Sequence, residues 1–240
     1  MSAVKPVAVF RFSDTEGPGH FATFLDAHRL PWTLVKLDEG DAVPRSSEPF
    51  AGLAFMGGPM SANDELPWTA PTLELMREAN ARGVPMIGHC LGGQMMSRAL
   101  GGAVTRNPVK EIGWNAVRVE DTPLARRWFG AELTEFTTFQ WHGETFTIPP
   151  GGERILTARY CPNQAYVIGE RHLGLQCHVE MTPEMIASWI ASGRSEIEAN
   201  LASPAVQPIE RITGEMRERL PALSGYADRL YARWIENLRR

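Results

Sequence analysis

The sequence predicts an α/β fold in which a mainly parallel central sheet lies between two layers of helices. Short apolar runs alternate with helix-period segments through the first hundred residues, a pattern typical of right-handed βαβ crossovers. One of these runs, Gly52–Gly57, is almost wholly apolar, as expected of a strand covered on both faces. Beyond about Gly102 strand-like pieces follow one another with little helix between them, which indicates antiparallel strands added to the same sheet.

The first half of the chain supplies the parallel strands. Its expected strands are Val7–Phe12, Thr33–Asp38, Gly52–Gly57 and Val84–His89. Its expected helices are Gly19–His28, Pro71–Arg82 and Leu91–Leu100. The second of these helices has proline in its first turn and Gly83 as its stop signal.

The second half begins with antiparallel strands and ends in helices. The expected strands are Asn115–Glu120, Glu135–Phe139, Ile155–Tyr160, Ala165–Glu170 and Gly174–Val179, with one short helix at Pro123–Phe129. After Thr182 the expected helices are Pro183–Ser192, Arg194–Ala202, Ile209–Leu220 and Ser224–Arg239. We therefore expect one main domain over residues 1–185 and a helical C-terminal extension, residues 186–240, packed on that domain.

Composition excludes several classes of protein. The 240 residues carry a net charge of −4, without the basic excess of a nucleic-acid binder. The three cysteines, Cys90, Cys161 and Cys177, are scattered and odd in number, which predicts reduced thiols in the cytoplasm and no disulfide framework. Neither a signal peptide, a membrane span nor a zinc-ligand cluster is expected.

The most informative segment runs from Val84 to Gln94. A buried strand leads into Cys90, and a helix follows at once, which predicts a nucleophile elbow at the carboxyl end of the sheet. Gly88 and Gly92 fit such a sharp turn because the neighbours of a strained residue must be small. The N-terminus of the following helix favours negative charge on the sulfur, and the N–H of Leu91 becomes a candidate oxyanion donor.

A thiol nucleophile also needs a base and a residue that orients it. His178 and Glu180 stand two residues apart on an apolar strand, so both side chains point to one face. We expect His178 to reach Cys90 and Glu180 to fix the tautomer of the histidine.

Four segments together resemble the class I (triad) glutamine amidotransferase family. Residues 88–94 resemble the G-x-C-x-G-x-Q signature of that family, and residues 176–180 are similar to its closing Q-F-H-P-E segment. Residues 57–60 resemble its oxyanion loop and residues 140–143 its glutamine-pocket segment. The sequence looks most like the stand-alone, GMP-synthase-like members. The resemblance implies a flavodoxin-like three-layer α/β/α fold.

The resemblance also implies roles for individual residues. Cys90, His178 and Glu180 would form the catalytic triad, and the backbone of Gly58 would join that of Leu91 in the oxyanion hole. The residues implied in substrate binding are Gln94, Trp141, His142, Gly143 and Pro59.

Two residues of the closing segment depart from the family pattern. Cys177 and Val179 replace the usual Phe and Pro. Since alternate residues of a strand face away from the site, the change is expected to alter packing and not chemistry. Cys177 and Cys161 are expected to be inert core thiols.

The expected reaction is hydrolysis of a γ-glutamyl amide through a Cys90 thioester, without cofactor or metal. The sequence has no glycine-rich phosphate loop, so ammonia would pass to an unidentified synthetase partner or be released. A free-standing γ-glutamyl peptidase is one alternative, and a non-catalytic relative that binds a small ligand or partner is another. In a related cysteine-elbow superfamily the acid would come from the first-strand region, where Glu16 stands. A homodimer remains open.

Overall fold

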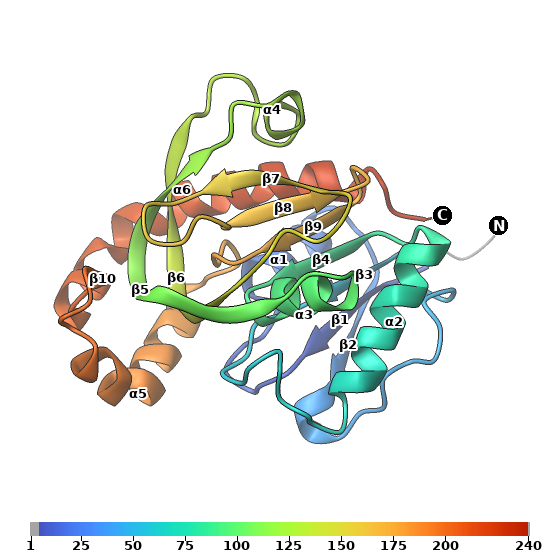
Figure 1. Ribbon diagram of the computed structural model, residues 1–240, viewed down its shortest axis with the longest axis horizontal. Helices are drawn as coiled ribbons and strands as arrows, with labels where there is room; N and C mark the ends of the chain where they lie inside the picture. Colours follow the sequence, from blue (N-terminus) through green and yellow to red (C-terminus); the bar gives the residue numbers. More distant parts are fainter. Residues whose placement is uncertain (1–4, 240) are drawn as a thin grey trace.

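The computed structural model describes residues 5–239, and these form one ten-stranded mixed sheet with helices on both faces (Figure 1). The strands are β1 (Val7–Arg11), β2 (Trp32–Lys36), β3 (Gly52–Phe55), β4 (Met86–His89), β5 (Val104–Val119), β6 (Glu135–Phe146), β7 (Gly152–Thr157), β8 (Ala165–Ile168), β9 (His172–Leu175) and β10 (Ala205–Val206). The α-helices are α1 (Gly19–Ala27), α2 (Thr69–Arg82), α3 (Leu91–Ala99), α4 (Pro123–Phe129), α5 (Pro183–Ala199) and α6 (Ile209–Ile235), and a short 3₁₀ helix, η1, covers Leu37–Glu39.

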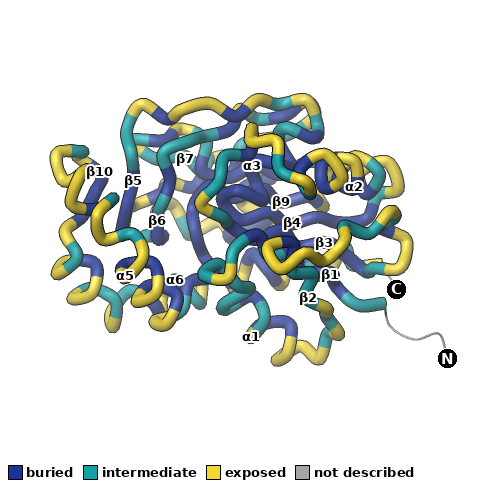
Figure 2. Tube along the Cα trace, turned by 90° about the horizontal axis from the view of Figure 1, so that it is seen from below, coloured by how far each residue is buried: buried dark blue, intermediate teal, exposed yellow. Residues whose placement is uncertain are grey.

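Period-two alternation along the strands builds two separate cores, one on each face of the sheet. In β1, Val7 and Val9 join the core under α1 and α6, while Ala8 and Phe10 join the core under α2 and α3. In Figure 2 the central strands are buried, whereas α1, α2 and α5 carry exposed residues on their outer sides. This arrangement confirms the predicted three-layer α/β class.

The sheet divides into a parallel half and an antiparallel half. Strands β2, β1, β3, β4 and β9 are neighbours in this order, and each pairing among them is parallel. Strands β8, β7, β5 and β6 continue the sheet through antiparallel pairings, and β10 adds a parallel edge to β5. The carboxyl ends of β4 and β9 therefore lie side by side where the two halves meet.

The C-terminal helices differ from the prediction, because four expected segments form two long helices. Helix α5 continues through Gly193, where a Cβ would lie 2.3 Å from Cζ2 of Trp141, so the glycine makes room for an indole ring and does not end the helix. Helix α6 continues through Pro221 because buried residues on both sides of it, including Leu220 and Leu223, pack into the core and offset the lost backbone hydrogen bond.

Strands β5, β6, β7, β9 and β10 also differ from the prediction. Strand β5 starts earlier than predicted and β6 ends later, because the two strands pair with each other along most of their length as a long hairpin. Strand β9 ends at Leu175, so His178 lies beyond it and pairs with Phe139 through an isolated bridge. The two-residue strand β10 was not predicted, since so short a segment carries no periodicity.

Within the described range, none of the helices is long and apolar enough to cross a bilayer. Met1–Val4, part of the segment considered for a signal peptide, lie outside the described residues, as does Arg240.

Candidate active site

The turn between β4 and α3 holds Cys90 in a strained backbone conformation. Cys90 has φ 46° and ψ −105°, a region that side chains with a Cβ rarely occupy. Its glycine neighbours make the turn possible: a Cβ on Gly88 would lie 2.5 Å from the carbonyl carbon of Gly92, and one on Gly92 would lie 2.2 Å from the oxygen of Phe55. Strand, turn and helix therefore meet at Cys90 as in a nucleophile elbow.

His178 and Glu180 lie on the segment that follows β9, the strand next to β4. The backbone of His178 is fixed on β6, since its N–H donates to the Phe139 oxygen at 2.8 Å. Its Nδ1 lies 2.6 Å from Oε1 of Glu180, and both side chains are almost fully buried. The i, i+2 spacing thus turns both side chains to one side even though β9 has ended.

Burial and charge act in opposite directions on this pair. Burial lowers the pKa of His178, but the charge of Glu180 and the neighbouring Cys90 sulfur outweigh it, so the pKa is raised well above its usual value. Burial likewise raises the pKa of Glu180, but the charge of His178 and the hydrogen bond from His178 outweigh it and hold the pKa at about 2. Glu180 is therefore a carboxylate that stabilises a positively charged His178.

Trp189 of α5 packs against the buried ring of His178. The two rings meet edge to face with centroids 4.7 Å apart, and Nε1 of Trp189 donates to the oxygen of Thr15 at 2.8 Å. Trp189 therefore ties α5 and the loop after β1 to the candidate base.

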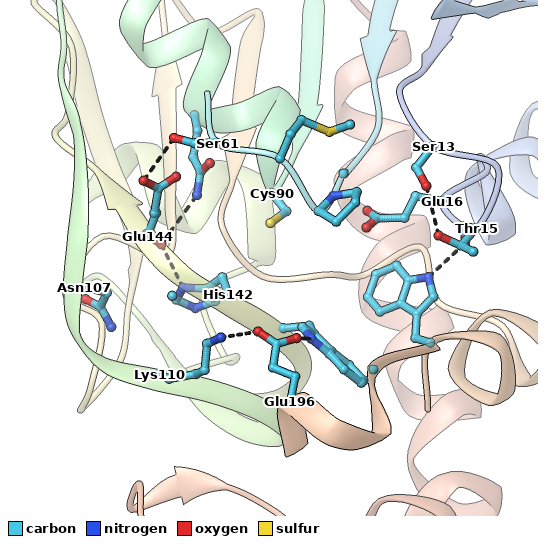
Figure 3. A pocket seen from close by; sticks show the side chains of 18 of the residues that line it. Ser13, Thr15, Glu16, Ser61, Cys90, Asn107, Lys110, His142, Glu144 and Glu196 are labelled. Atoms are coloured by element: carbon cyan, nitrogen blue, oxygen red, sulfur yellow. Dashed lines mark hydrogen bonds and ion pairs between the residues drawn. The ribbon is translucent and has the colours of Figure 1, made fainter. Parts of the chain in front are cut away.

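Glu16 lines the candidate site, although from the sequence it was a candidate acid only if the protein belonged to the alternative superfamily. A Cβ on Gly57 would lie 2.0 Å from Oε2 of Glu16 and 3.1 Å from Cε1 of His178, so the carboxyl group and the ring pack on the same glycine. Glu16 also lines the cavity in front of Cys90 (Figure 3). Burial raises its pKa to about 7, with the charge of His178 opposing and that of Glu180 reinforcing the rise. The only sequence signal was a carboxylate in the loop after the first strand.

Two buried glutamines connect the nucleophile to the pocket wall. Gln176 directs Nε2 toward the sulfur of Cys90 at 3.6 Å, and Gln94 donates to Oε1 of Gln176 at 3.2 Å. Gln94 also lies 3.4 Å from the backbone oxygen of Glu144. Gln176 was not among the predicted site residues, although it opens the closing segment of the family signature.

The two predicted oxyanion donors belong to segments that contact each other. A Cβ on Gly58 would lie 2.7 Å from Cδ2 of Leu91, so the loop after β3 and the start of α3 are in contact. The N–H of Leu91 belongs to the first turn of α3, where N–H groups have no partner within the helix. Gly58 lines the same cavity as Cys90.

The cavity has a volume of about 760 Å³ and opens in front of Cys90. Its wall includes the predicted residues Gly58, Pro59, Cys90, Gln94, Trp141, His142 and Gly143. Trp141 donates Nε1 to Oε2 of Glu196 at 2.8 Å, and Glu196 also pairs with Lys110, so α5 is held against β5 and β6 at the far wall (Figure 3).

His142 takes part in a second buried polar cluster. Its Nδ1 lies 2.9 Å from the Glu144 oxygen and its Nε2 lies 3.1 Å from Oε2 of Glu111. Gln164 donates to the same oxygen of Glu111 at 3.0 Å. Ligand atoms of Glu111, His142 and Cys161 lie within 4.8 Å of one another, a set of types that could hold a soft divalent cation. Among the described residues His142 Nε2 has no partner with hydrogen-bond geometry, but the close contact with Glu111 across β5 and β6 fits a structural role in fixing the strand pair.

Cys161 and Cys177 are buried away from the cavity. Burial raises the pKa of Cys161 to about 11 and raises that of Cys177 further. Both thiols therefore stay protonated at neutral pH.

The fold is that of the class I glutamine amidotransferases. A family model described as glutamine amidotransferase class-I matches residues 25–190, and this chain belongs to that family. This confirms the resemblance drawn from the four segments.

Individual relatives show that the chain is GMP-synthase-like within this family. It is 29% identical to the glutamine amidotransferase-like protein YfeJ of Salmonella typhimurium, over 71% of this chain and 72% of that protein. It is 32% identical to a glutamine-hydrolyzing GMP synthase of Clostridium perfringens, over 74% of this chain but only 35% of that protein. A glutamine amidotransferase structure from Methylobacillus flagellatus superposes with a TM-score of 0.96 at 44% identity, covering 99% of this chain and 97% of that one.

Proposed function

We propose that this protein hydrolyses the γ-carboxamide of glutamine or of a related γ-glutamyl compound, with Cys90 as nucleophile, His178 as base and Glu180 as the residue that orients His178. One observation carries the proposal. Cys90 stands on a strained strand-to-helix turn, faces a cavity, and has beside it a buried histidine bonded to a carboxylate at 2.6 Å.

In the first half-reaction the Cys90 thiol gives its proton to His178 as the sulfur attacks the γ-carbonyl carbon and forms a C–S bond. The N–H groups of Gly58 and Leu91 would stabilise the resulting oxyanion. The C–N bond then breaks, and His178 gives its proton to the leaving ammonia. In the second half-reaction His178 takes a proton from water as the water oxygen adds to the thioester carbon. The C–S bond then breaks to release glutamate, and His178 returns the proton to the sulfur of Cys90.

The proposed fate of the ammonia is drawn from a relative. The chain covers about a third of the Clostridium GMP synthase, a protein whose name couples glutamine hydrolysis to a synthesis. By analogy, the ammonia would pass to a synthetase partner that acts in trans. A cytoplasmic setting, which the three unpaired thiols favour, would give access to such a partner.

A free-standing hydrolase of γ-glutamyl compounds is the second candidate, and the size of the cavity favours it. A volume of about 760 Å³ is in the range that holds drug-sized ligands, larger than a single amino acid. The outer wall, with Lys110 and Glu196, would then contact the group attached to the γ-carbonyl.

The test is to incubate the purified protein with glutamine and, separately, with γ-glutamyl dipeptides, and to measure released glutamate and ammonia. We expect turnover of at least one substrate, and a loss of about 10⁴-fold or more in Cys90→Ala, because the nucleophile is removed. Cys161→Ala is the matched control and should retain activity. Turnover that survives in Cys90→Ala would contradict the proposal.

A further inference from the structure

The second carboxylate oxygen of Glu180 has no hydrogen-bond partner among the described residues. Oε1 is bonded to His178, whereas Oε2 is buried and unpaired. A buried charged oxygen without a donor costs more free energy than most polar groups, so a neighbouring donor is expected. The polar group that faces it is the ring of His89, whose Nε2 lies 3.9 Å from Oε2.

His89 comes directly before the nucleophile at the end of β4, and its ring is fully buried. Its Nε2 lies 3.1 Å from the hydroxyl of Tyr231, a buried residue of α6. Phe21 of α1 packs on Tyr231 with ring centroids 4.8 Å apart and on His89 at 6.0 Å. The ring edge that carries Nε2 is therefore held toward Glu180 by two helices.

The protonation of the His89 ring decides whether it can donate a hydrogen bond to Glu180. Burial lowers the pKa of His89, although the charge of Glu180 opposes the fall, so the ring is neutral and has one N–H to donate. With that hydrogen on Nε2, the Tyr231 hydroxyl oxygen at 3.1 Å and the Glu180 carboxylate at 3.9 Å are both acceptors for it, so the ring can share the hydrogen between them. The distance of 3.9 Å closes to a hydrogen bond with a small ring movement, as is common when an active site tightens around its substrate.

We propose that His89 is a positioning residue for the reaction: its Nε2–H, oriented by Tyr231 of α6, supports the second oxygen of Glu180 and so fixes His178 against Cys90. The inference rests on the proposed function of Cys90, His178 and Glu180. It also gives the C-terminal helix a part in the site, which the sequence alone did not indicate.

The experiment compares His89→Leu, which removes the donor, with His89→Gln, which keeps an N–H group at similar reach, and with Tyr231→Phe. For each variant kcat, KM and Tm are measured with the substrate that the wild type hydrolyses. We expect kcat of His89→Leu to fall about tenfold with KM unchanged, since a hydrogen bond to a charged group is lost. His89→Gln should recover most of the rate, and Tyr231→Phe should lose less than His89→Leu.

Stability separates positioning from packing. His89→Leu leaves the buried Tyr231 hydroxyl without its partner, so its Tm should fall, whereas the double variant His89→Leu/Tyr231→Phe replaces both polar groups and should recover Tm without recovering kcat. Wild-type kcat in His89→Leu, or equal losses of kcat and Tm in both His89 variants, would overturn the proposal.

The reactivity of Cys90 can be measured without substrate, so it tests the role of His89 independently of the proposed glutamine hydrolysis. The rate of alkylation of Cys90 by iodoacetamide at pH 7, followed by peptide mass spectrometry, should fall in His89→Leu and recover in His89→Gln. If the wild type hydrolyses neither substrate, the proposed function fails, and this rate still decides the role of His89: equal rates in wild type and His89→Leu would overturn it.

Discussion

Two of the buried histidine–glutamate pairs in this site differ in what lies beyond the histidine. In one, His178 and Glu180 are two residues apart in sequence and 2.6 Å apart in space, and Cys90 lies beside the ring. In the other, His142 and Glu111 face each other across β5 and β6 at 3.1 Å, and Cys161 lies nearby.

The difference between the pairs is one of surroundings and not of residue type. The Cys90 sulfur stands on an elbow and faces the cavity, whereas the Cys161 sulfur is within 3.2 Å of the Thr145 hydroxyl and is fully buried. A thiol with a raised pKa and no access to a ligand cannot act as a nucleophile. We therefore assign chemistry to the first pair and support of the pocket wall to the second, and three predictions test this division.

The largest effect is expected for Glu180→Gln. The variant keeps the shape of the side chain but loses the charge that stabilises protonated His178, and the amide can favour the wrong tautomer. We expect kcat to fall by about 10³-fold with little change in KM, by analogy with the acid of serine triads. Steady-state kinetics of the variant and the wild type measures kcat and KM. Activity within tenfold of wild type would show that Glu180 is not the orienting residue.

Glu111→Gln is expected to act on stability and substrate affinity. Removing the charge that faces His142 should lower the free energy of unfolding by about 2 kcal/mol, because a buried charged hydrogen bond is weakened. KM should rise, since β6 carries the pocket residues Trp141 to Gly143, while kcat should change much less than in Glu180→Gln. Urea denaturation and kinetics measure both. The control is Glu120→Gln, which breaks the more exposed pair with Arg154 and should cost under about 1 kcal/mol.

If Glu111→Gln lowered kcat as far as Glu180→Gln without loss of stability, the division between the two pairs would be wrong.

The last prediction concerns Glu16→Gln, and its effect on stability depends on pH. The Glu16 pKa is raised by burial from 4.5 to about 7, so the folded protein binds a proton in this window and stability falls as pH rises through it. The variant, which stays neutral, should be more stable than wild type by about 1–3 kcal/mol above pH 7. The two proteins should not differ near pH 4. Thermal unfolding over a range of pH measures the difference in stability between the variant and the wild type. The control is Asp14→Asn, a substitution at an exposed residue close to Glu16 in sequence. A difference independent of pH would contradict the argument.

The sequence was sufficient where the determinants are local. Glycines on both sides of Cys90 predict the elbow, and the i, i+2 spacing of His178 and Glu180 predicts a shared face even though the strand ends early. The alternation of apolar runs likewise predicts a sheet with two covered faces.

Contacts between segments that are distant in the chain could not be predicted from the sequence. Glu16 enters the site because the loop after β1 folds over Gly57, and Glu111 because β5 and β6 form a long hairpin. Gly193 and Pro221 read as helix breakers, but packing against Trp141 and against the core overrides their local preference.

The central claim is that a γ-carboxamide binds between Cys90 and the two backbone donors, and a crystal structure of Cys90→Ala with glutamine tests it most directly. The account predicts that the γ-carbonyl carbon lies above residue 90, with its oxygen toward the N–H groups of Gly58 and Leu91 and its nitrogen toward His178. Glutamine bound with its carboxamide directed away from residue 90 would contradict it.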